Sequence, residues 1–166
     1  MAVVERPRDR TPGRPGERVE RRTFIKVPPR AVWCALHDPA NTDRLFPELG
    51  LGPAEPAWPA AAAVRYGRAR LGLLRSAAVA ESLEARPQSR FRLRVSGPTF
   101  ESEWTWHLEP LAGGTRVVHD ASFESTDRLS GWLLRLGRES LAARVEEHLR
   151  ELKACAEGGT GKDAPA

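Results

Sequence analysis

The feature that most constrains this chain is a series of three segments in which apolar and polar residues alternate. They span about 90–95, 104–109 and 117–124, and glycine turns separate them. A period of two places alternate side chains on one face of a β-strand. The inward positions are Phe91, Leu93, Val95, Trp104, Trp106, Leu108, Val117, His119, Ala121 and Phe123. Three antiparallel strands with one apolar face need a covering layer, which the rest of the chain must supply.

The C-terminal segment predicts that cover. From about 127 to 157, apolar residues recur at spacings near three and four, as in an amphipathic helix. At ~1.5 Å per residue the helix would be about 45 Å long, enough to cross a sheet. Gly131 and Gly137 lie in its first half. They indicate either room for a cavity or a kinked first turn, and the sequence leaves both open.

The N-terminal half begins with another strand. Residues 18–27 alternate, and Pro28-Pro29 ends the strand and starts a short helix, because proline is tolerated in a first helical turn. That helix should end before Pro39, and a second short helix or turn should start near Ala40. From 60 to 85, alanines favour helix whereas glycines and short alternation favour strands. The strand register between 50 and 86 therefore stays open.

The length of the chain predicts its domain organisation, and its charge bears on nucleic-acid binding. The 166 residues predict one domain over 17–157, with disordered tails over 1–16 and 158–166. The net charge is +4 and the pI about 9.7, but the basic residues are nearly all arginine and many have acidic neighbours. We therefore disfavour nucleic-acid binding, which should show a steep salt dependence.

Motifs of common catalytic and transport classes are missing from the sequence. It has no phosphate-binding loop, dinucleotide fingerprint, serine-hydrolase elbow or zinc-protease motif, so we expect no cofactor and no metal. No apolar stretch approaches about 20 residues and no secretory signal is visible. Cys34 and Cys155 form no CxxC pair and are expected to be reduced thiols in a cytoplasmic protein. The oligomeric state stays open, a homodimer included.

The order of these elements resembles the START/polyketide-cyclase superfamily, also called SRPBCC. Residues 27–33 look like its first strand end and first helix start, and Leu36-His37-Asp38-Pro39 like that helix's end. Leu108-Glu109-Pro110 followed by 113–117 resembles its final hairpin, and 149–153 its closing helix. The likeness covers about 17–157. One departure is Leu45-Phe46-Pro47, where the family commonly has Trp before Pro, and Phe46 could take that role.

The resemblance implies an α+β helix-grip fold. In this fold a curved antiparallel sheet of about six or seven strands, preceded by two short helices, wraps a long C-terminal helix over a cavity. It further implies a small apolar partner such as a polyketide, lipid, steroid or quinone. The family marks a fold more than an activity. The residues expected to line the cavity are Phe46, Tyr66, Leu93, Trp104, Trp106, His119, Phe123, Trp132 and Leu136.

Polar candidates for chemistry are few. His119 shares the apolar face of its strand, where it could bond a ligand or exchange protons, or be a core histidine satisfied by a protein partner. Tyr66 could point inward and offer a hydroxyl, although its register is unsettled. The other histidines are expected elsewhere: His37 exposed at a helix end, His107 on a charged strand face, and His148 solvated beside glutamates.

Several functions remain open on this basis. Ligand binding ranks first, a metal-free cyclase/dehydratase-like enzyme second, and a protein-interaction module third. The interaction module would use an outer surface such as the row of Arg90, Arg92 and Arg94. That row could bind phosphate, or it could be a solvated strand face paired with Glu101 and Glu103 on the next strand.

Overall fold

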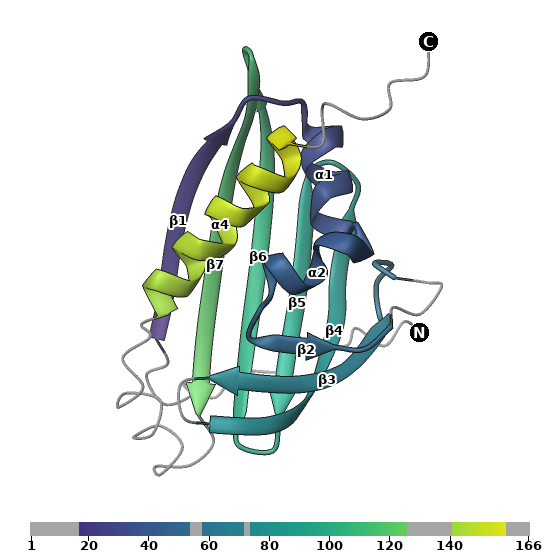
Figure 1. Cartoon of the computed structure of the whole chain (residues 1–166). Helices are drawn as coiled ribbons and strands as arrows, with labels where there is room; N and C mark the ends of the chain where they lie inside the picture. The colour runs from purple at the N-terminus through teal and green to yellow at the C-terminus, as the bar shows by residue number, and fades with distance from the viewer. Residues whose placement is uncertain (1–16, 54–57, 72–73, 126–140, 159–166) are drawn as a thin grey trace, which may run out of the picture.

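The computed structural model of the chain describes residues 17–53, 58–71, 74–125 and 141–158 (Figure 1). The expected tails lie outside the described residues except for Gly158, which is the last residue of the C-terminal helix. The first half of the predicted C-terminal helix, with Gly131, Trp132, Leu136 and Gly137, also lies outside them.

One antiparallel sheet organises the described residues. Its seven strands stand in the order β1-β7-β6-β5-β4-β3-β2, so the chain's first strand pairs with its last. Figure 1 shows the sheet curving around the helices. The strands are β1 (Glu17–Ile25), β2 (Leu49–Leu51), β3 (Val64–Leu71), β4 (Leu74–Arg86), β5 (Arg90–Gly97), β6 (Phe100–Leu111) and β7 (Gly114–Ser125). The predicted α+β helix-grip fold is confirmed.

Helices lie on the concave side of the sheet. The N-terminal ones are α1 (Pro29–His37), the 3₁₀ turn η1 (Pro39–Asn41) and α2 (Thr42–Leu45). Pro29 stands at the start of α1 and Pro39 follows its end, as predicted. The described part of the C-terminal helix is α4 (Leu141–Gly158), which packs against β1, β7 and α1 (Figure 1).

The unsettled region folds as strands despite its alanines. Ala69, Ala78 and Ala80 are buried on the inner face of β3 and β4, whereas Arg68 and Ala77 are exposed on the outer face. Small apolar side chains and arginines give a weak alternation signal, so tertiary burial overrides alanine's helix propensity here. Gly67 is needed for close backbone packing, because a Cβ atom there would lie 2.5 Å from the carbonyl oxygen of Gly50 on β2.

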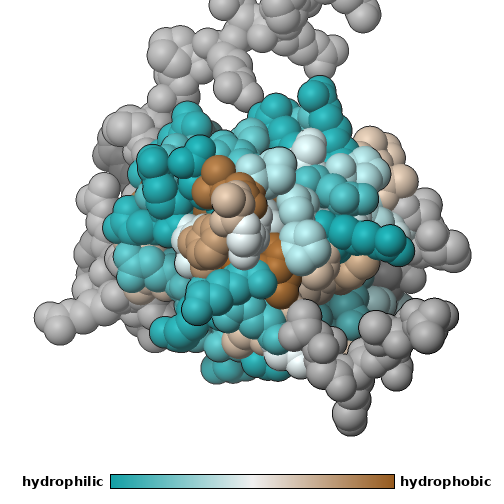
Figure 2. All heavy atoms as spheres, turned by 90° about the horizontal axis from the view of Figure 1, so that it is seen from above, coloured by the Kyte–Doolittle hydropathy of each residue, from teal (hydrophilic) through white to brown (hydrophobic). Residues whose placement is uncertain are grey.

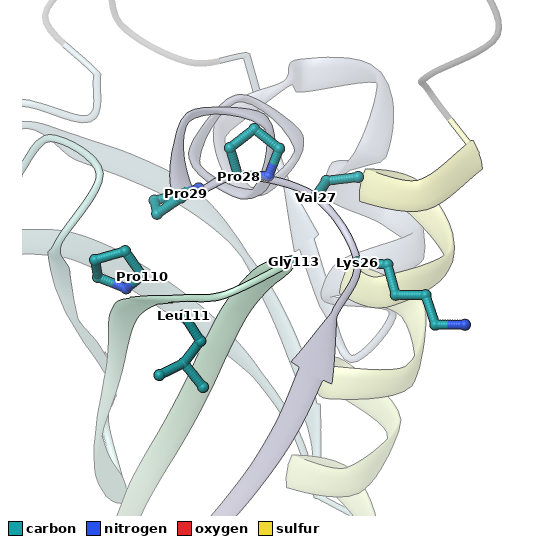
Figure 3. A pocket seen from close by; sticks show the side chains of 8 residues that line it. Lys26, Val27, Pro28, Pro29, Pro110, Leu111 and Gly113 are labelled. Atoms are coloured by element: carbon teal, nitrogen blue, oxygen red, sulfur yellow. The ribbon is translucent and has the colours of Figure 1, made fainter.

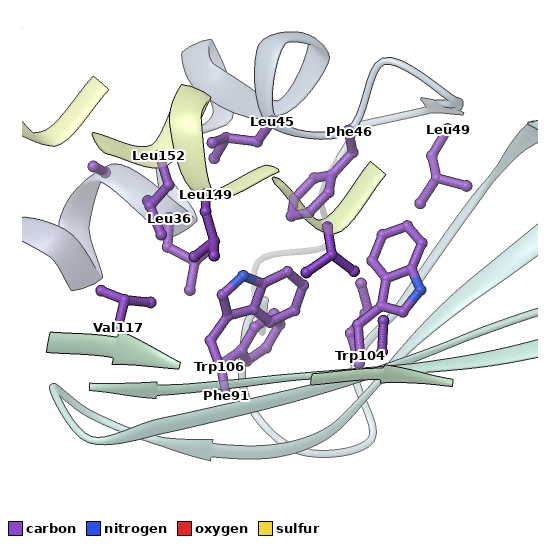
Figure 4. Close-up of a cluster of buried hydrophobic side chains, with 14 of the residues drawn as sticks. Leu36, Leu45, Phe46, Leu49, Phe91, Trp104, Trp106, Val117, Leu149 and Leu152 are labelled. Carbon is purple, nitrogen blue, oxygen red and sulfur yellow. The ribbon is translucent and has the colours of Figure 1, made fainter. Parts of the chain in front are cut away.

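The core fills the space between the sheet and the helices. Trp106, Phe91 and Val117 rise from the strands, and Leu36, Leu149 and Leu152 descend from the helices onto them (Figure 4). Each of these side chains is buried. Apolar burial of about 25 cal/mol per Å² makes this contact the main force that fixes α1 and α4 on the sheet.

Candidate functional site

An aromatic wall lines the middle of the concave face. Trp104 and Trp106 project from β6, and Phe46, just after α2, packs against both with ring centroids 5.7 Å apart in each case. Phe91 on β5 stacks on Trp106, also at 5.7 Å. Figure 4 shows the rings of Phe46, Trp104 and Trp106 directed toward one another. The predicted inward face of these strands is therefore correct, and Phe46 lies over it.

A chain of buried polar groups runs beside this wall. His119 on β7 places its Nδ1 atom 3.1 Å from the Thr105 carbonyl oxygen and its Nε2 atom 3.1 Å from Nδ1 of His148 on α4. Nε2 of His148 lies 2.7 Å from Oε1 of Glu48, which immediately precedes β2. His119, His148 and Glu48 are all buried. The chain therefore joins the sheet, α4 and the α2–β2 connection inside the core.

The geometry fixes how many protons this chain holds. A carbonyl only accepts, so His119 donates from Nδ1 and its Nε2 atom accepts from Nδ1 of His148. The third contact needs one more proton, located either on Nε2 of His148 or on the Glu48 carboxyl group. Each contact thus contains one proton. Removing any of these three protons would leave two lone pairs facing each other in the core. Such a contact is unfavourable where no water can supply a hydrogen bond.

Charges around Glu48 decide where the third proton lies. Burial opposes ionisation of the carboxylate and is the largest influence on its pKa. The hydrogen bond from His148 and the charges of His148 and Arg144 outweigh that influence and lower the pKa of Glu48. Nη1 of Arg144 lies 3.3 Å from Oε2 of Glu48. The carboxylate of Glu48 is therefore ionised, and it accepts the hydrogen bond from Nε2 of His148.

His119 is the neutral end of the chain. Burial lowers the pKa of its imidazole well below the usual value, and the nearby His148 charge lowers it further. Its ring also stacks on Trp106 with centroids 4.3 Å apart. Both nitrogens of His119 and of His148 are used within the protein. This arrangement matches the expectation of a core histidine satisfied by protein partners, and a ligand could bond either ring only by displacing a partner.

The expectation that Tyr66 points inward is wrong. Its side chain is 67% exposed on the outer face of β3, whereas Arg65 is buried. Alternation along the strand accounts for this, because Arg65, Gly67 and Ala69 take the inner positions. Tyr66 is thereby removed from the interior, both as a lining residue and as a proton donor.

Two further histidine predictions are corrected. His148 is not solvated beside Glu146 and Glu147 but buried at 2% exposure. His37 is not exposed: its ring packs against Trp33 and Phe91, with centroids 4.2 and 4.6 Å away. Burial of His37 lowers its pKa to about 4, although a hydrogen bond to the Trp33 carbonyl opposes the shift.

Helical spacing contained a signal for His148 that the neighbouring glutamates obscured. The residue lies three positions after Val145 and four before Leu152, which puts it on the buried stripe of α4. Glu48 had no such signal, since it follows a proline and precedes a three-residue strand. Only the fold brings Glu48, 100 positions away, to His148.

The remaining expected lining residues divide into two groups. Leu93 is buried beside the wall, and Phe123 is half-buried and stacks on Phe100 with centroids 5.8 Å apart. Trp132 and Leu136 lie outside the described residues. No group of three or more His, Cys, Asp or Glu side chains in the described part of the chain could hold a metal ion. No helix within those same residues is long and apolar enough to cross a membrane.

A buried arginine lies near the β2 edge of the sheet. Arg65 donates from Nη2 to the Gly52 carbonyl oxygen at 2.7 Å and from Nη1 toward the Thr42 hydroxyl at 3.4 Å. Its guanidinium lies 5.5 Å from the ring centroid of Trp58. Burial lowers its pKa, while Asp43 acts in the opposite direction. A carbonyl, a hydroxyl and an aromatic face thus hold this cation near the small side chains of β3 and β4.

A surface hollow lies at one end of the molecule, between the β1–α1 connection and the β6–β7 hairpin (Figure 3). Its lining residues are Lys26, Val27, Pro28, Pro29, Pro110, Leu111, Gly113 and Gly114. Figure 2 looks onto this end and shows a small apolar area surrounded by hydrophilic residues. The hollow is open and separate from the Trp104–Trp106 wall, so it is not the interior cavity that the sequence predicts.

The outer face of the sheet carries the predicted arginine row. Arg92 pairs with Glu103, and Arg94 lies 3.5 Å from Glu101, as expected for cross-strand partners. Glu84 lies 3.5 Å from Arg90. These pairs agree with the expectation of a charge-compensated strand face.

Known proteins share this architecture. The fold and its aromatic interior are those of a helix-grip protein. Residues 17–157 match the family described as "Polyketide cyclase / dehydrase and lipid transport". That match spans most of the chain, so the chain belongs to this family. None of the curated proteins compared with the chain matches it.

Solved structures share the fold. TTHA0849 from Thermus thermophilus is 25% identical, with a TM-score of 0.65 over 87% of this chain and 100% of that one. The ZhuI aromatase/cyclase from Streptomyces sp. R1128 is 17% identical, with a TM-score of 0.63 over 87% and 93%. DynU16, a protein of the dynemicin biosynthetic locus, is 23% identical, with a TM-score of 0.56 over 87% of this chain and 49% of that one.

Proposed function

We propose that this protein binds a small hydrophobic molecule between the concave face of the sheet and α4. The ligand class is that of polyketides, lipids, steroids or quinones. Membership of a family that includes polyketide cyclases and lipid transport proteins supports the proposal. The aromatic wall supports it too, because rigid rings such as Trp104 and Trp106 suit flat apolar ligands.

The observation that carries the proposal is the difference in side-chain size along the inner face of the sheet. Large aromatic residues line β5 and β6, whereas five described inner positions of β3 and β4 carry small side chains beside the buried Arg65, namely Gly67, Ala69, Ser76, Ala78 and Ala80. Protein interiors are close-packed, so small residues on a concave sheet face leave volume that another group must occupy. Aromatic rings therefore lie beside small side chains on the inner face, and this arrangement suits a flat ligand.

A neighbouring pair of alanines gives a matched test. Ala78 is buried on the inner face of β4, and Ala77 is exposed on the outer face. We expect wild type to bind Nile red saturably at one site, and Ala78→Leu to weaken that binding about tenfold, which is roughly 1.4 kcal/mol. Ala77→Leu should bind as wild type does, and circular dichroism should show all three proteins folded.

Two results would count against the proposal. Binding of Nile red that never saturates would indicate adsorption to the surface. An equal loss in the Ala77 and Ala78 variants would show that the probe does not occupy the inner face.

A cyclase/dehydratase-like activity is the second candidate, and the Glu48–His148–His119 chain favours it. Buried groups that hold a defined proton are typical of sites that move protons. Against it, the protein uses every nitrogen of both rings. Catalysis would therefore require the chain to open when substrate binds. Turnover of a polyketide-like chain that His148→Gln abolishes without loss of binding would support this candidate over simple binding.

A further inference from the structure

The outer face of β3 presents a basic strip at the end of the sheet remote from β1 and α4 (Figure 1). Tyr66, Arg68 and Arg70 alternate outward along the strand, and all three are exposed. Arg75 on β4 is also exposed and stands directly opposite Arg70 in the strand pairing. We call these four residues the β3 strip.

No acidic side chain in the described part of the chain pairs with the arginines of the strip. Within the described residues, the side chains of Arg68, Arg70 and Arg75 form no hydrogen bond or ion pair, whereas Arg92 and Arg94 on β5 each pair with a glutamate of β6. Like charges directly opposite on paired strands are destabilising by up to about 1 kcal/mol. The fold gives no reason for the Arg70–Arg75 pair, because both side chains lie outside the core.

We propose that the β3 strip is the docking surface for an acidic α-helix of a partner protein. Alternate residues on a strand lie about 6.7 Å apart. Helix residues four positions apart lie about 6 Å apart along the axis. Carboxylates at positions i and i+4 of a helix laid along β3 can therefore meet Arg68 and Arg70. Arg75 adds a further donor beside Arg70, and Tyr66 offers an aromatic face with a hydroxyl at the end of the strip.

The surroundings favour a compact acidic partner over an extended polyanion. In the strand pairing, Tyr66 stands opposite Val79 on β4, and the same row continues through Ser96 on β5 to Glu101 on β6. Glu81 lies two positions after Val79 on β4. A nucleic-acid strand crossing from β3 onto the sheet would meet these carboxylates. Among the described residues, the exposed large apolar side chains are Phe24 on β1, Leu111 on β6 and Tyr66, so Tyr66 is the one that lies in the strip.

The test uses the full chain and a fluorescein-labelled helical peptide with glutamates at positions i, i+4 and i+8 on an alanine background. Fluorescence anisotropy should show saturable binding that weakens with salt, because exposed charges are screened. A peptide of the same length with glutamine in place of glutamate should not bind. Arg68→Glu, Arg70→Glu and Arg75→Glu combined should weaken binding by about a hundredfold, or roughly 2.8 kcal/mol.

A matched control separates the strip from net charge. Arg22, Arg116 and Arg150 are also exposed, pair with Glu20, Glu109 and Glu147, and change the net charge equally when reversed to glutamate. That control variant should keep binding within about threefold of wild type. Equal loss in both variants would overturn the proposal, as would absence of peptide binding to wild type at low salt. Strip-dependent binding of single-stranded DNA or anionic phosphatidylglycerol vesicles that is tighter than peptide binding would also overturn it.

Discussion

Nε2 of His119 lies 3.1 Å from Nδ1 of His148, so one hydrogen bond inside the core ties the last strand of the sheet to the C-terminal helix. Glu48 extends that link to the α2–β2 connection, and Thr105 anchors it on β6. The neutral ring of His119, the ring of His148 and the carboxylate of Glu48 make a chain in which each contact contains one proton. The chain therefore makes the stability of the fold sensitive to pH and to single substitutions.

Removing one partner of the buried pair should cost far more than removing both. Glu48→Leu removes the carboxylate that accepts from Nε2 of His148 and leaves that nitrogen buried without its partner, and we expect a loss of about 3 kcal/mol in the free energy of unfolding. His148→Leu leaves the Glu48 carboxylate buried beside Arg144 alone and should cost a similar amount. The double variant Glu48→Leu/His148→Leu should lose clearly less than the sum. Urea denaturation at pH 7 gives all three values, and additivity within about 0.5 kcal/mol would contradict the account.

Stability should fall as pH drops from 6.5 toward 4, because His37 and His119 resist protonation in the fold. The pKa of His37 is lowered from 6.5 to about 4, so in this interval the unfolded chain binds more protons than the folded one. Stability therefore rises with pH there, and lowering the pH removes it. The His37 shift corresponds to at most about 3 kcal/mol.

Substitution of His37 isolates its share. His37→Leu should flatten the pH dependence of the urea midpoint between 6.5 and 4. Glu48 acts at lower pH: its pKa is depressed, so its stabilisation is present above 4.5 and disappears as pH falls through the folded value. A His37→Leu profile parallel to wild type would show that burial of this ring has no energetic consequence.

The glycine pair between β2 and β3 should respond unequally to a methyl group. A Cβ atom at Gly67 would lie 2.5 Å from the Gly50 carbonyl oxygen, whereas one at Gly50 would lie an ordinary 3.7 Å from the Arg68 carbonyl oxygen. We expect Gly67→Ala to lower the free energy of unfolding by at least about 2 kcal/mol, and Gly50→Ala by less than about 1 kcal/mol. Equal effects in thermal denaturation would mean that β2 is not held tightly against β3.

His119→Phe separates a core histidine from a ligand contact. Because both of its nitrogens bond protein atoms, we expect the folded variant to bind Nile red within about threefold of wild type while losing thermal stability. A folded variant that no longer binds the probe would place His119 in the ligand site instead.

Much of the fold could be predicted because its strands have strong alternation. Phe91, Leu93 and Val95 alternate with arginines, so the inner and outer faces of β5 are readable without a structure. The prolines at 28, 29 and 39 likewise mark the ends of α1. The signal fails on β3 and β4, where alanine and glycine stand on the inner face and arginine's long stem tolerates either face. Tyr66 was misplaced for that reason.

The polar part of the site could not be predicted from local pattern. His148 lies on the buried stripe of α4, but its partner Glu48 is 100 residues away and follows no motif. Pairing of buried charges is a property of tertiary contact, and a glutamate beside a proline carries no sign that its side chain enters the core. The aromatic wall was predictable in contrast, because Trp104 and Trp106 share a strand face.

The central claim is that the interior holds a small hydrophobic molecule. Native mass spectrometry of the protein purified gently from its own host, followed by extraction with organic solvent, tests it most directly. We predict a mass above that of the 18.3 kDa chain by one small molecule, which extraction releases and Ala78→Leu reduces while Ala77→Leu does not. A chain that carries no ligand, and that takes up none of a polyketide, fatty-acid, steroid and quinone panel added in excess, would contradict the claim.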